Sequence, residues 1–225
     1  MLQKWGDRLI CYEDIRRNDE INAYIDAGNA MLGVLGYTEH SRAHAAKVAE
    51  EAGAILRALG YPERDIELCR IAGYMHDIGN AVNRTDHAHS GALMAREILK
   101  ELGMPYADIA DVMAAIGNHD EKTGTAVTPI SAALILADRT DVRRSRVRNK
   151  DMSSFDIHDR VNYAAIASEL SITKETIHLN VTLDERICSM LDYFEIFLDR
   201  MLMCRRAAEL LGVRFKFTVN GSKVI

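Results

Sequence analysis

The feature that most constrains the fold is a set of histidines and aspartates at the ends of predicted helices or of their apolar stripes. The densest instance is His76-Asp77-Ile78-Gly79, which ends a helix predicted over 63–77. Adjacent residues do not share a helix face. At a fraying helix end, however, both side chains can reach one point, and glycine lets the chain turn away sharply. A fold that joins several such helix ends would gather imidazoles and carboxylates in one pocket.

The other members of this set are His44, His87, His119 and Asp138. A single histidine on an apolar stripe is more often a hydrogen-bonded core residue than a ligand, so the argument depends on their number. Asp138 follows an almost wholly apolar run over 130–137. A carboxylate in such a buried helix costs free energy unless it is paired or bound to a metal. Asp138 is therefore the member whose purely structural interpretation is weakest.

Composition limits the class of protein and the partners that this chain can have. The chain has 225 residues, 48% apolar and 27% charged, which suits a globular protein with one large domain or a domain plus an appendage. The net charge of −5 argues against nucleic acid as a partner of the whole protein. The four cysteines are widely spaced, so we expect reduced thiols in a cytoplasmic protein. We expect neither a secretion signal nor a membrane span.

Apolar residues at helical spacing predict a mainly α protein over residues 1–155. Glycine and proline separate the helices at Gly36, at 60–62 and at 103–105. The predicted helices cover 12–35, 39–59 behind an N-cap at Thr38, 63–77, 87–102 behind a cap at Asp86, 106–118, and a central helix that starts at Thr128-Pro129 and continues into a basic segment ending at Lys150.

Imidazoles and carboxylates without thiolates suit iron, manganese, zinc, nickel or magnesium. One divalent ion would take His44, His76, Asp77 and Asp138, and a second ion would take His87 and His119 with Asp77 bridging. His87 is preferred to His89, which lies about 200° further round the helix. Paired ions of this kind can generate hydroxide near neutral pH and clamp a phosphoryl oxygen.

Polar residues near the set have two interpretations each. Arg84 is the only cation in the loop 79–86 and either pairs with a phosphate oxygen or is solvated. His40 either contacts a substrate phosphate at the mouth of the cavity or lies in solvent. Asp120 and Glu121 either orient an imidazole, transfer a proton as acid or base, or remain loop carboxylates in water.

The basic end of the central helix has two interpretations as well. Arg139, Arg143, Arg146 and Lys150 would share one helix face. This face is either an anion or nucleotide site, or a solvated helix end that complements the helix dipole. Asp141, one turn after Asp138, would brace the site or an arginine.

The order H…HD…H…H…D resembles the HD superfamily of metal-dependent phosphohydrolases. The segments that carry the resemblance are HAAKVAEEAG at His44, AGYMHDIGN at His76, DHAHSGALMAREIL at His87, AIGNHDEKTG at His119 and AALILADRTD at Asp138. The resemblance implies a helical bundle around one or two divalent ions. His87 and His119 match the extra histidines of two-metal members, such as the cyclic-di-nucleotide phosphodiesterases and the bacterial diadenosine tetraphosphatases.

Departures from the family pattern narrow the range of expected substrates. Many two-metal members have lysine where this chain has Asn80, so Arg84 or the basic face would have to neutralise the substrate. Asn80 would be one of the residues that contact it. The cyclic-di-nucleotide branch carries paired histidines and a GYP signature, whereas this chain has Asn118-His119 and no GYP. This argues against cyclic di-nucleotides. A second pair, His158-Asp159, is followed by Arg-Val and is interpreted as a structural helix start.

Residues 156–225 are predicted as a small α+β unit. We expect a helix over 157–170, a strand over 176–183, a helix from Asp184 as cap to Leu211, and a strand around 215–219 before an Asn220-Gly221 turn. The two strands would pair in parallel, and two strands make a poor sheet alone. We therefore expect the sheet to be completed by a second subunit in a homodimer or by the helical body, as a regulatory or dimerising unit.

The leading hypothesis is a phosphohydrolase, either phosphatase or phosphodiesterase, with Asp77 and metal-activated hydroxide at its centre. Its substrate would be a small phosphorylated compound, with nucleotides the favoured class. A rival from another class is a di-iron oxygenase on the same scaffold. A third hypothesis is a catalytically silent, metal-bound sensor or binding module.

Overall fold

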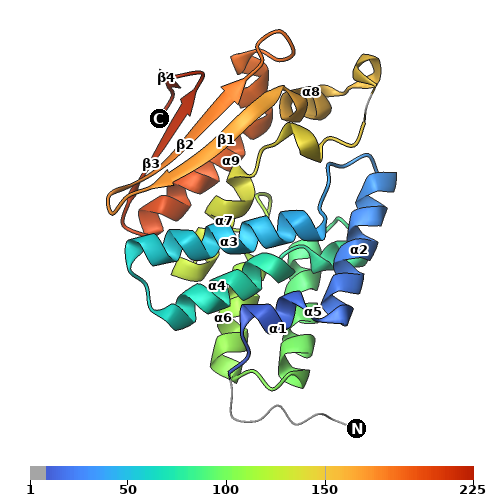
Figure 1. The fold of residues 1–225 in the computed structure, drawn as a ribbon, viewed down its shortest axis with the longest axis vertical. Coiled ribbons are helices and arrows are strands. Elements are labelled where there is room, and N and C mark those ends of the chain that lie inside the picture. The colour runs from blue at the N-terminus through green and yellow to red at the C-terminus, as the bar shows by residue number, and fades with distance from the viewer. Residues whose placement is uncertain (1–8, 150) are drawn as a thin grey trace.

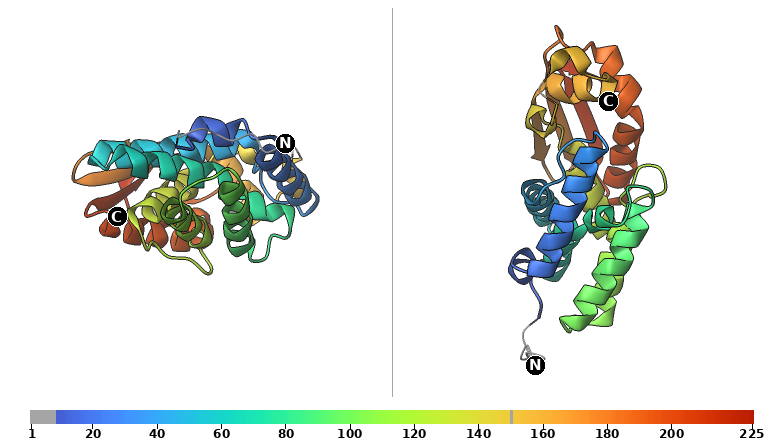
Figure 2. Two further views of the ribbon diagram at one scale, coloured as in Figure 1. Left: turned by 90° about the horizontal axis from the view of Figure 1, so that it is seen from below. Right: turned by 90° about the vertical axis from the view of Figure 1, so that its right-hand side faces the viewer.

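The computed structural model describes residues 9–149 and 151–225. Helices form the body of the molecule, and a small sheet with a long helix behind it forms one end (Figure 1). The right-hand view of Figure 2 shows the sheet at the opposite end of an elongated molecule from the far ends of α5 and α6. The predicted mainly α fold with a small C-terminal α+β part is confirmed.

The helices and strands follow one another in a simple order. The helices are α1 (Tyr12–Arg16), α2 (Asp19–Val34), α3 (Arg42–Leu59), α4 (Glu63–Met75), α5 (His87–Glu101), α6 (Tyr106–Gly117), α7 (Pro129–Thr140), α8 (Ile157–Ala164) and α9 (Met190–Leu210), with 3₁₀ turns η1 (Ile78–Ala81), η2 (Arg144–Arg146) and η3 (Met152–Ser154). The strands are β1 (Ala165–Ile172), β2 (Thr176–Leu183), β3 (Arg214–Val219) and β4 (Ser222–Lys223).

Helix α7 lies at the centre. Its start is as predicted, since the Thr128 hydroxyl accepts from the Ser131 amide in a capping box, with proline at the first helical position. Residues 132–137 are completely buried, and α7 packs against α3, α4, α6 and α9. The helix ends at Thr140, however, so the predicted continuation into the basic segment is wrong. Lys150 lies outside the described residues.

Three predicted helix starts differ in detail. The helix expected over 12–35 is two helices, because the Asn18 side chain accepts from the Ile21 amide and starts α2 afresh. Ser41, not Thr38, caps α3. Asp86 precedes α5 with a φ of 58°, and its side chain makes no cap hydrogen bond. Asn18 and Ser41 thus cap the first amides of α2 and α3, whereas no side chain caps the first amides of α5.

The C-terminal part contains a sheet of its own. The helix predicted over 157–170 ends at Ala164, and 165–172 forms β1, which pairs antiparallel with β2. Strands β2 and β3 are parallel, as predicted, and β4 pairs antiparallel with β3 across the Asn220-Gly221 turn. The four strands lie in sequence order. The expected two-stranded sheet is therefore wrong, and the chain itself supplies the missing strands.

Helix α9 joins the two parts. Ser189, not Asp184, caps it through the Asp192 amide, and the helix contacts α7 on one side and β3 on the other. The division of the chain at residue 155 stays a prediction. The four cysteines form no disulfide, and three of them are buried. None of the helices in the described part of the chain combines the length and hydropathy that a membrane-spanning segment needs.

Two glycines bring η1 against the start of α5. A Cβ on Gly79 would lie 2.0 Å from the carbonyl oxygen of His87, and a Cβ on Gly91 would lie 3.2 Å from the Gly79 nitrogen. Position 79 therefore admits no side chain, and a side chain at position 91 would be tightly packed. The contact holds the turn after Asp77 beside the first turn of α5.

Candidate metal centre

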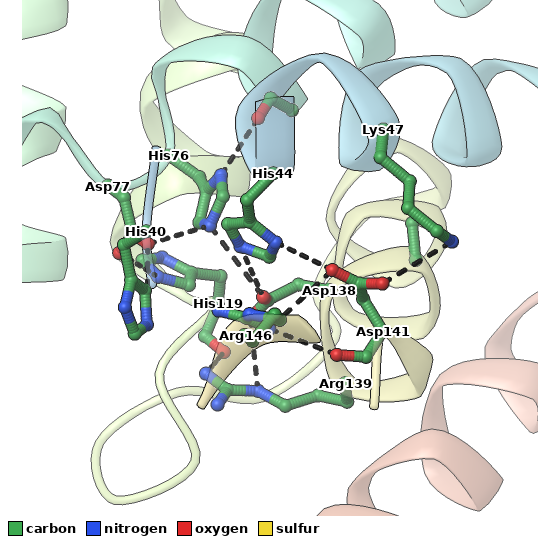
Figure 3. Close-up of polar contacts among 12 residues, drawn as sticks. His40, His44, Lys47, His76, Asp77, His119, Asp138, Arg139, Asp141 and Arg146 are labelled. Atoms are coloured by element: carbon green, nitrogen blue, oxygen red, sulfur yellow. Dashed lines mark hydrogen bonds and ion pairs between the residues drawn. The ribbon is translucent and has the colours of Figure 1, made fainter. Parts of the chain in front are cut away.

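The six predicted ligand residues meet at one place in the structure, although they span nearly one hundred positions of sequence. Figure 3 shows His44, His76, Asp77, His119 and Asp138 of this set. His44 lies in the first turn of α3, His76 caps the C-terminus of α4 and precedes Asp77, His87 begins α5, His119 follows α6, and Asp138 lies in the last turn of α7. Three overlapping groups have ligand atoms within 4.8 Å of one another: His44–His76–Asp77, His76–His119–Asp138 and Asp77–His87–His119.

The four histidines are buried, and each uses its Nδ1 atom in the same way. The Nδ1 partners are Asp141 Oδ2 for His44 (2.8 Å), Gly73 O for His76 (2.8 Å), Arg84 O for His87 (3.1 Å) and Ile116 O for His119 (2.6 Å). These oxygens accept hydrogen bonds, so each Nδ1 donates and the Nε2 atom of a neutral ring presents its lone pair. Hydrogen bonds thus aim four Nε2 atoms at the centre.

The Nε2 atoms face carboxylates and each other. Nε2 of His44 and Nε2 of His76 are buried without a hydrogen-bond partner in the described part of the chain, and lie 3.3 and 3.7 Å from Asp138 Oδ1. Nε2 of His87 and Nε2 of His119 are 3.2 Å apart. Ligands held about 2.1 Å from one ion stand roughly 3.0–3.5 Å from one another. The donor set and its spacing therefore fit divalent metal.

Asp77 faces both halves of the centre. Its Oδ2 lies 3.2 Å from Nε2 of His76. Its Oδ1 lies 3.5 Å from Nε2 of His87 and 3.9 Å from Nε2 of His119. One oxygen of the carboxylate thus faces His76 and the other faces His87 and His119, which is the arrangement that a bridging ligand requires.

The side chains shift one another's pKa. Burial lowers the pKa of His76, but the Asp77 and Asp138 carboxylates overcome this and raise it to about 9. Burial lowers the pKa of His87 to about 4. Burial also acts to raise the pKa of Asp77 and Asp138, but the adjacent imidazoles, together with Arg139 beside Asp138, hold both well below the usual range. At neutral pH, a metal binding at His76 would have to displace a proton.

Asp141 braces the centre from behind. Its buried carboxylate accepts from Nδ1 of His44 and, through both oxygens, from Arg143 at 2.6 and 3.0 Å. Lys47 and Arg146 add positive charge at 3.4 and 3.6 Å. These neighbours hold the pKa of Asp141 well below its usual value, against the opposing effect of burial. The sequence allowed that Asp141 would brace the site or an arginine, and the structure shows both.

Two predicted substrate contacts, Arg84 and His40, lie beside the centre. Nη1 of Arg84 is 3.3 Å from Nε2 of His87, and the guanidinium lies 5.5 Å from the centroid of the half-exposed Tyr37 ring. Nε2 of His40 lies 3.9 Å from Asp77 Oδ2, and burial lowers the pKa of His40 well below its usual value. The surface interpretation of His40 is therefore wrong.

Asn80 is the third predicted substrate contact, and it lies against Asp77 in the interior. It is buried, and its Nδ2 donates to the backbone oxygen of Asp77 at 3.0 Å and to Asp77 Oδ1 at 2.8 Å. This places Asn80 as a support of Asp77 and not as a substrate contact.

The three described arginines of the predicted basic face do not share a face, because they go to different partners. Arg139 is buried, and its Nη2 donates to the carbonyl oxygen of His119 at 2.7 Å. Arg143 holds Asp141. Arg146 donates to the backbone oxygens of Glu39 and Asp141 at 2.9 and 3.0 Å. Arg139 and Arg143 thus support the centre and are not aligned as an anion site.

The two carboxylates after His119 differ in their surroundings. Asp120 Oδ1 lies 3.9 Å from Arg139 Nη2. Glu121 Oε2 lies 3.8 Å from Arg139 Nη1 and accepts from Nε of Arg200, in α9, at 3.1 Å. Two guanidinium groups therefore hold Glu121, which disfavours the predicted acid–base role for it more than for Asp120.

Sequence reasoning missed three contributors: Lys47, Tyr37 and Arg200. Lys47 lies one helical turn after His44, so spacing could have suggested it. Tyr37 lies in the connection before α3, where no pattern marks it. Arg200 stands 79 positions from Glu121, and nothing in the sequence links the two.

Residues 39–157, slightly more than half of the chain, match the sequence model of the HD domain. An uncharacterized protein of Methanocaldococcus jannaschii is 29% identical over a 166-residue alignment, and the match covers 64% of this chain and 63% of the relative.

Two further relatives carry a functional name. Ribonuclease Y of Oceanobacillus iheyensis is 32% identical over 121 residues, and ribonuclease Y of Enterococcus faecalis is 30% identical over 119 residues. Each match covers 53% of this chain and 21% of the relative. The chain thus spans less than two thirds of the length of each of these relatives. A predicted HD superfamily hydrolase from an uncultured Thermotogales bacterium matches 55% of this chain and 67% of its own, with 27% identity and a TM-score of 0.43.

Proposed function

Because the chain belongs to the HD-domain family, we propose that it is a metal-dependent phosphohydrolase that cleaves a nucleotide or another small phosphate ester. The observation that supports this most directly is the convergence of four inward-facing Nε2 atoms on two carboxylates, one of which faces both halves of the centre.

The ligand assignment follows from that geometry. His44, His76, Asp77 and Asp138 would hold one divalent ion, and His87 and His119 would hold a second ion with Asp77 shared. Such ions offset charge on phosphoryl oxygens and lower the pKa of a bound water to near neutrality. Iron, manganese, zinc, nickel and magnesium all accept this donor set to some degree, and imidazole favours the transition metals among them.

The surrounding residues would bind and orient the substrate. Arg84 stands beside His87 and can donate to a phosphate oxygen in a charge-assisted hydrogen bond. Tyr37, next to Arg84, presents a half-exposed aromatic ring on which a nucleobase could stack. His40, neutral because burial lowers its pKa, can orient a polar group near Asp77. Asp120 is the better candidate for transferring a proton, since Glu121 is held by two arginines.

Size and charge favour a small substrate over nucleic acid. The net charge of −5 disfavours long polyanions, and ribonuclease Y is matched over only about a fifth of its length. A ribonuclease nevertheless cleaves phosphodiester bonds, so RNA belongs in the test as an alternative substrate.

The test couples metal analysis to substrate screening. We expect purified protein to contain divalent transition metal and to hydrolyse a member of a panel of phosphate esters that includes nucleotides, sugar phosphates and an RNA oligomer. A monoester would release phosphate, and a diester would release a phosphate monoester and an alcohol. The variant His87→Ala should lower both metal content and turnover. His89→Ala is the matched control, because that imidazole is on the same helix but exposed.

Three results would contradict the proposal in different ways. Protein that binds no divalent metal after careful loading would exclude the centre itself. Two bound irons with oxygen uptake and no phosphate release would favour the oxygenase. Full metal content without turnover across the panel would favour the sensor or binding module.

A further inference from the structure

One residue of α9 reaches the polar network behind the candidate metal centre. Helix α9 lies outside the residues that match the HD domain. Arg200, in its middle, is partly buried, and its guanidinium lies 4.5 Å from the centroid of the Phe197 ring and donates through Nε to Glu121. The C-terminal part of the chain thus contacts the loop that follows His119.

The contact continues through Glu121 to Arg139. The same carboxylate oxygen, Oε2, accepts from Arg200 and lies 3.8 Å from Nη1 of Arg139. Arg139 is buried, so its charge requires negative neighbours to offset the cost of desolvation. Glu121 is one of these neighbours, and Arg200 keeps it in place.

Arg139 in turn contacts two of the proposed ligand residues, one from each half of the centre. Its Nη2 donates to the backbone oxygen of His119 at 2.7 Å, and its Nε lies 3.4 Å from Asp138 Oδ2. Figure 3 shows the Arg139 guanidinium lying against both groups. A shift of Arg139 would therefore move an imidazole in one half and a carboxylate in the other.

We propose that Arg200 is a positioning residue through which the C-terminal helix sets the affinity of the centre for divalent metal. The inference rests on the proposed metal centre, and it assigns to the C-terminal part a role that the HD domain alone does not supply. Arg200 holds Glu121, Glu121 holds Arg139, and Arg139 fixes His119 and Asp138. Partners outside the ligand set commonly change metal affinity by about 10–100-fold. Arg200 reaches the ligand residues only through Glu121 and Arg139, so we expect a smaller change, about 3–10-fold.

The test uses the full-length protein with Co²⁺ as probe, because its visible absorption reports both binding and the arrangement of ligands. Arg200→Gln should raise the Co²⁺ dissociation constant about 3–10-fold and alter the absorption bands. Arg200→Lys retains the positive charge and should recover part of the affinity. Arg205→Gln is the control, since Arg205 is exposed on the same helix and pairs only with Glu209 among the described contacts; its dissociation constant should stay within about twofold of the wild-type value.

A double-mutant cycle separates positioning from simple loss of stability. If Arg200 acts through Glu121, Arg200→Gln should have little further effect on Co²⁺ affinity in a Glu121→Gln background. Urea unfolding of each metal-free variant records any loss of stability independently. An unchanged Co²⁺ constant and spectrum in Arg200→Gln, or effects of the two substitutions that multiply, would overturn the inference while leaving the metal centre intact. Wild-type protein that binds no Co²⁺ would overturn the proposed function and this inference together.

Discussion

Replacing Asp141 with asparagine tests how the buried charge behind the centre is stabilised. The substitution keeps size and shape but removes a carboxylate whose side chain is completely buried. That carboxylate faces four positively charged or protonatable groups, namely His44, Lys47, Arg143 and Arg146. Removing one member of a buried ion pair costs about 3–5 kcal/mol. Arg143 and Lys47 are partly exposed and can recover hydration when the carboxylate is removed. We therefore expect Asp141→Asn to lower the free energy of unfolding by about 2–4 kcal/mol at pH 7.

The pH dependence of this loss follows from the direction of the pKa shift. The pKa of Asp141 is held well below its usual value in the folded protein. The stability that the carboxylate contributes is therefore fully present above the unfolded-state pKa and is lost as the pH falls through the folded-state pKa. The difference between wild type and Asp141→Asn should be constant from about pH 8 to pH 5 and should shrink below about pH 4.

Metal affinity should change as well. Asp141 fixes the ring of His44 through Nδ1, and the loss of such a partner typically weakens metal binding by about 10–100-fold. An asparagine carbonyl still accepts from Nδ1, so the lower end of that range is expected.

The assay is urea unfolding of metal-free protein followed by circular dichroism, together with Co²⁺ titration. Asp184→Asn is the matched control, because Asp184 binds Arg186 through the same two-nitrogen contact two residues along, with the arginine in solvent. Its effect should be much smaller. An Asp141→Asn protein within about 1 kcal/mol of wild type at pH 7, or a difference that grows below pH 4, would refute the electrostatic reasoning.

Three further predictions address the packing, the thiols and the substrate. Gly79→Ala should lower the free energy of unfolding by more than about 3 kcal/mol and remove most of the metal affinity, since the new methyl would meet the His87 carbonyl oxygen at 2.0 Å. Gly117→Ala is the control, because its Cβ would make only ordinary contact, and it should leave the thermal unfolding temperature unchanged or slightly raised. A thiol reagent should modify Cys11 first in native protein and reach the three buried cysteines only after denaturation, because burial raises their pKa; early labelling of a buried thiol would contradict the packing. Arg84→Met should raise the KM for a phosphate ester by about tenfold or more with a smaller change in kcat, and an unchanged KM in steady-state assays would exclude the assigned contact.

Local structure was predictable where a residue's own neighbours decide it. Thr128-Pro129 starts α7 because its cap and its proline act on the next three residues. Alternating apolar residues predicted β2 with its observed bounds and the core of β3, because one face of each strand is buried. The six candidate ligands could be chosen because the sequence repeats one chemical pattern at successive helix ends.

Predictions failed where a distant partner decides the outcome. Residues 165–172 have a composition that a helix tolerates, and they form a strand because β2 offers them a complete antiparallel ladder. The chain leaves the helical conformation after Thr140, and the buried Asp141 then takes hydrogen bonds from Arg143 and from His44. The arginines expected on one face therefore turn to separate oxygens, among them the Glu39 carbonyl bound by Arg146.

The sequence by itself determined which side chains are available to the centre and which helix ends carry them, because caps, glycines and apolar periodicity act over a few residues. Only the tertiary structure decided which oxygen of Asp77 faces which imidazole, and that Arg200 of α9 anchors Glu121. The physical reason is that a buried charge must find its counter-charge in space. The sequence shows which charged residues are present, and the packing of the helices decides which of them form pairs.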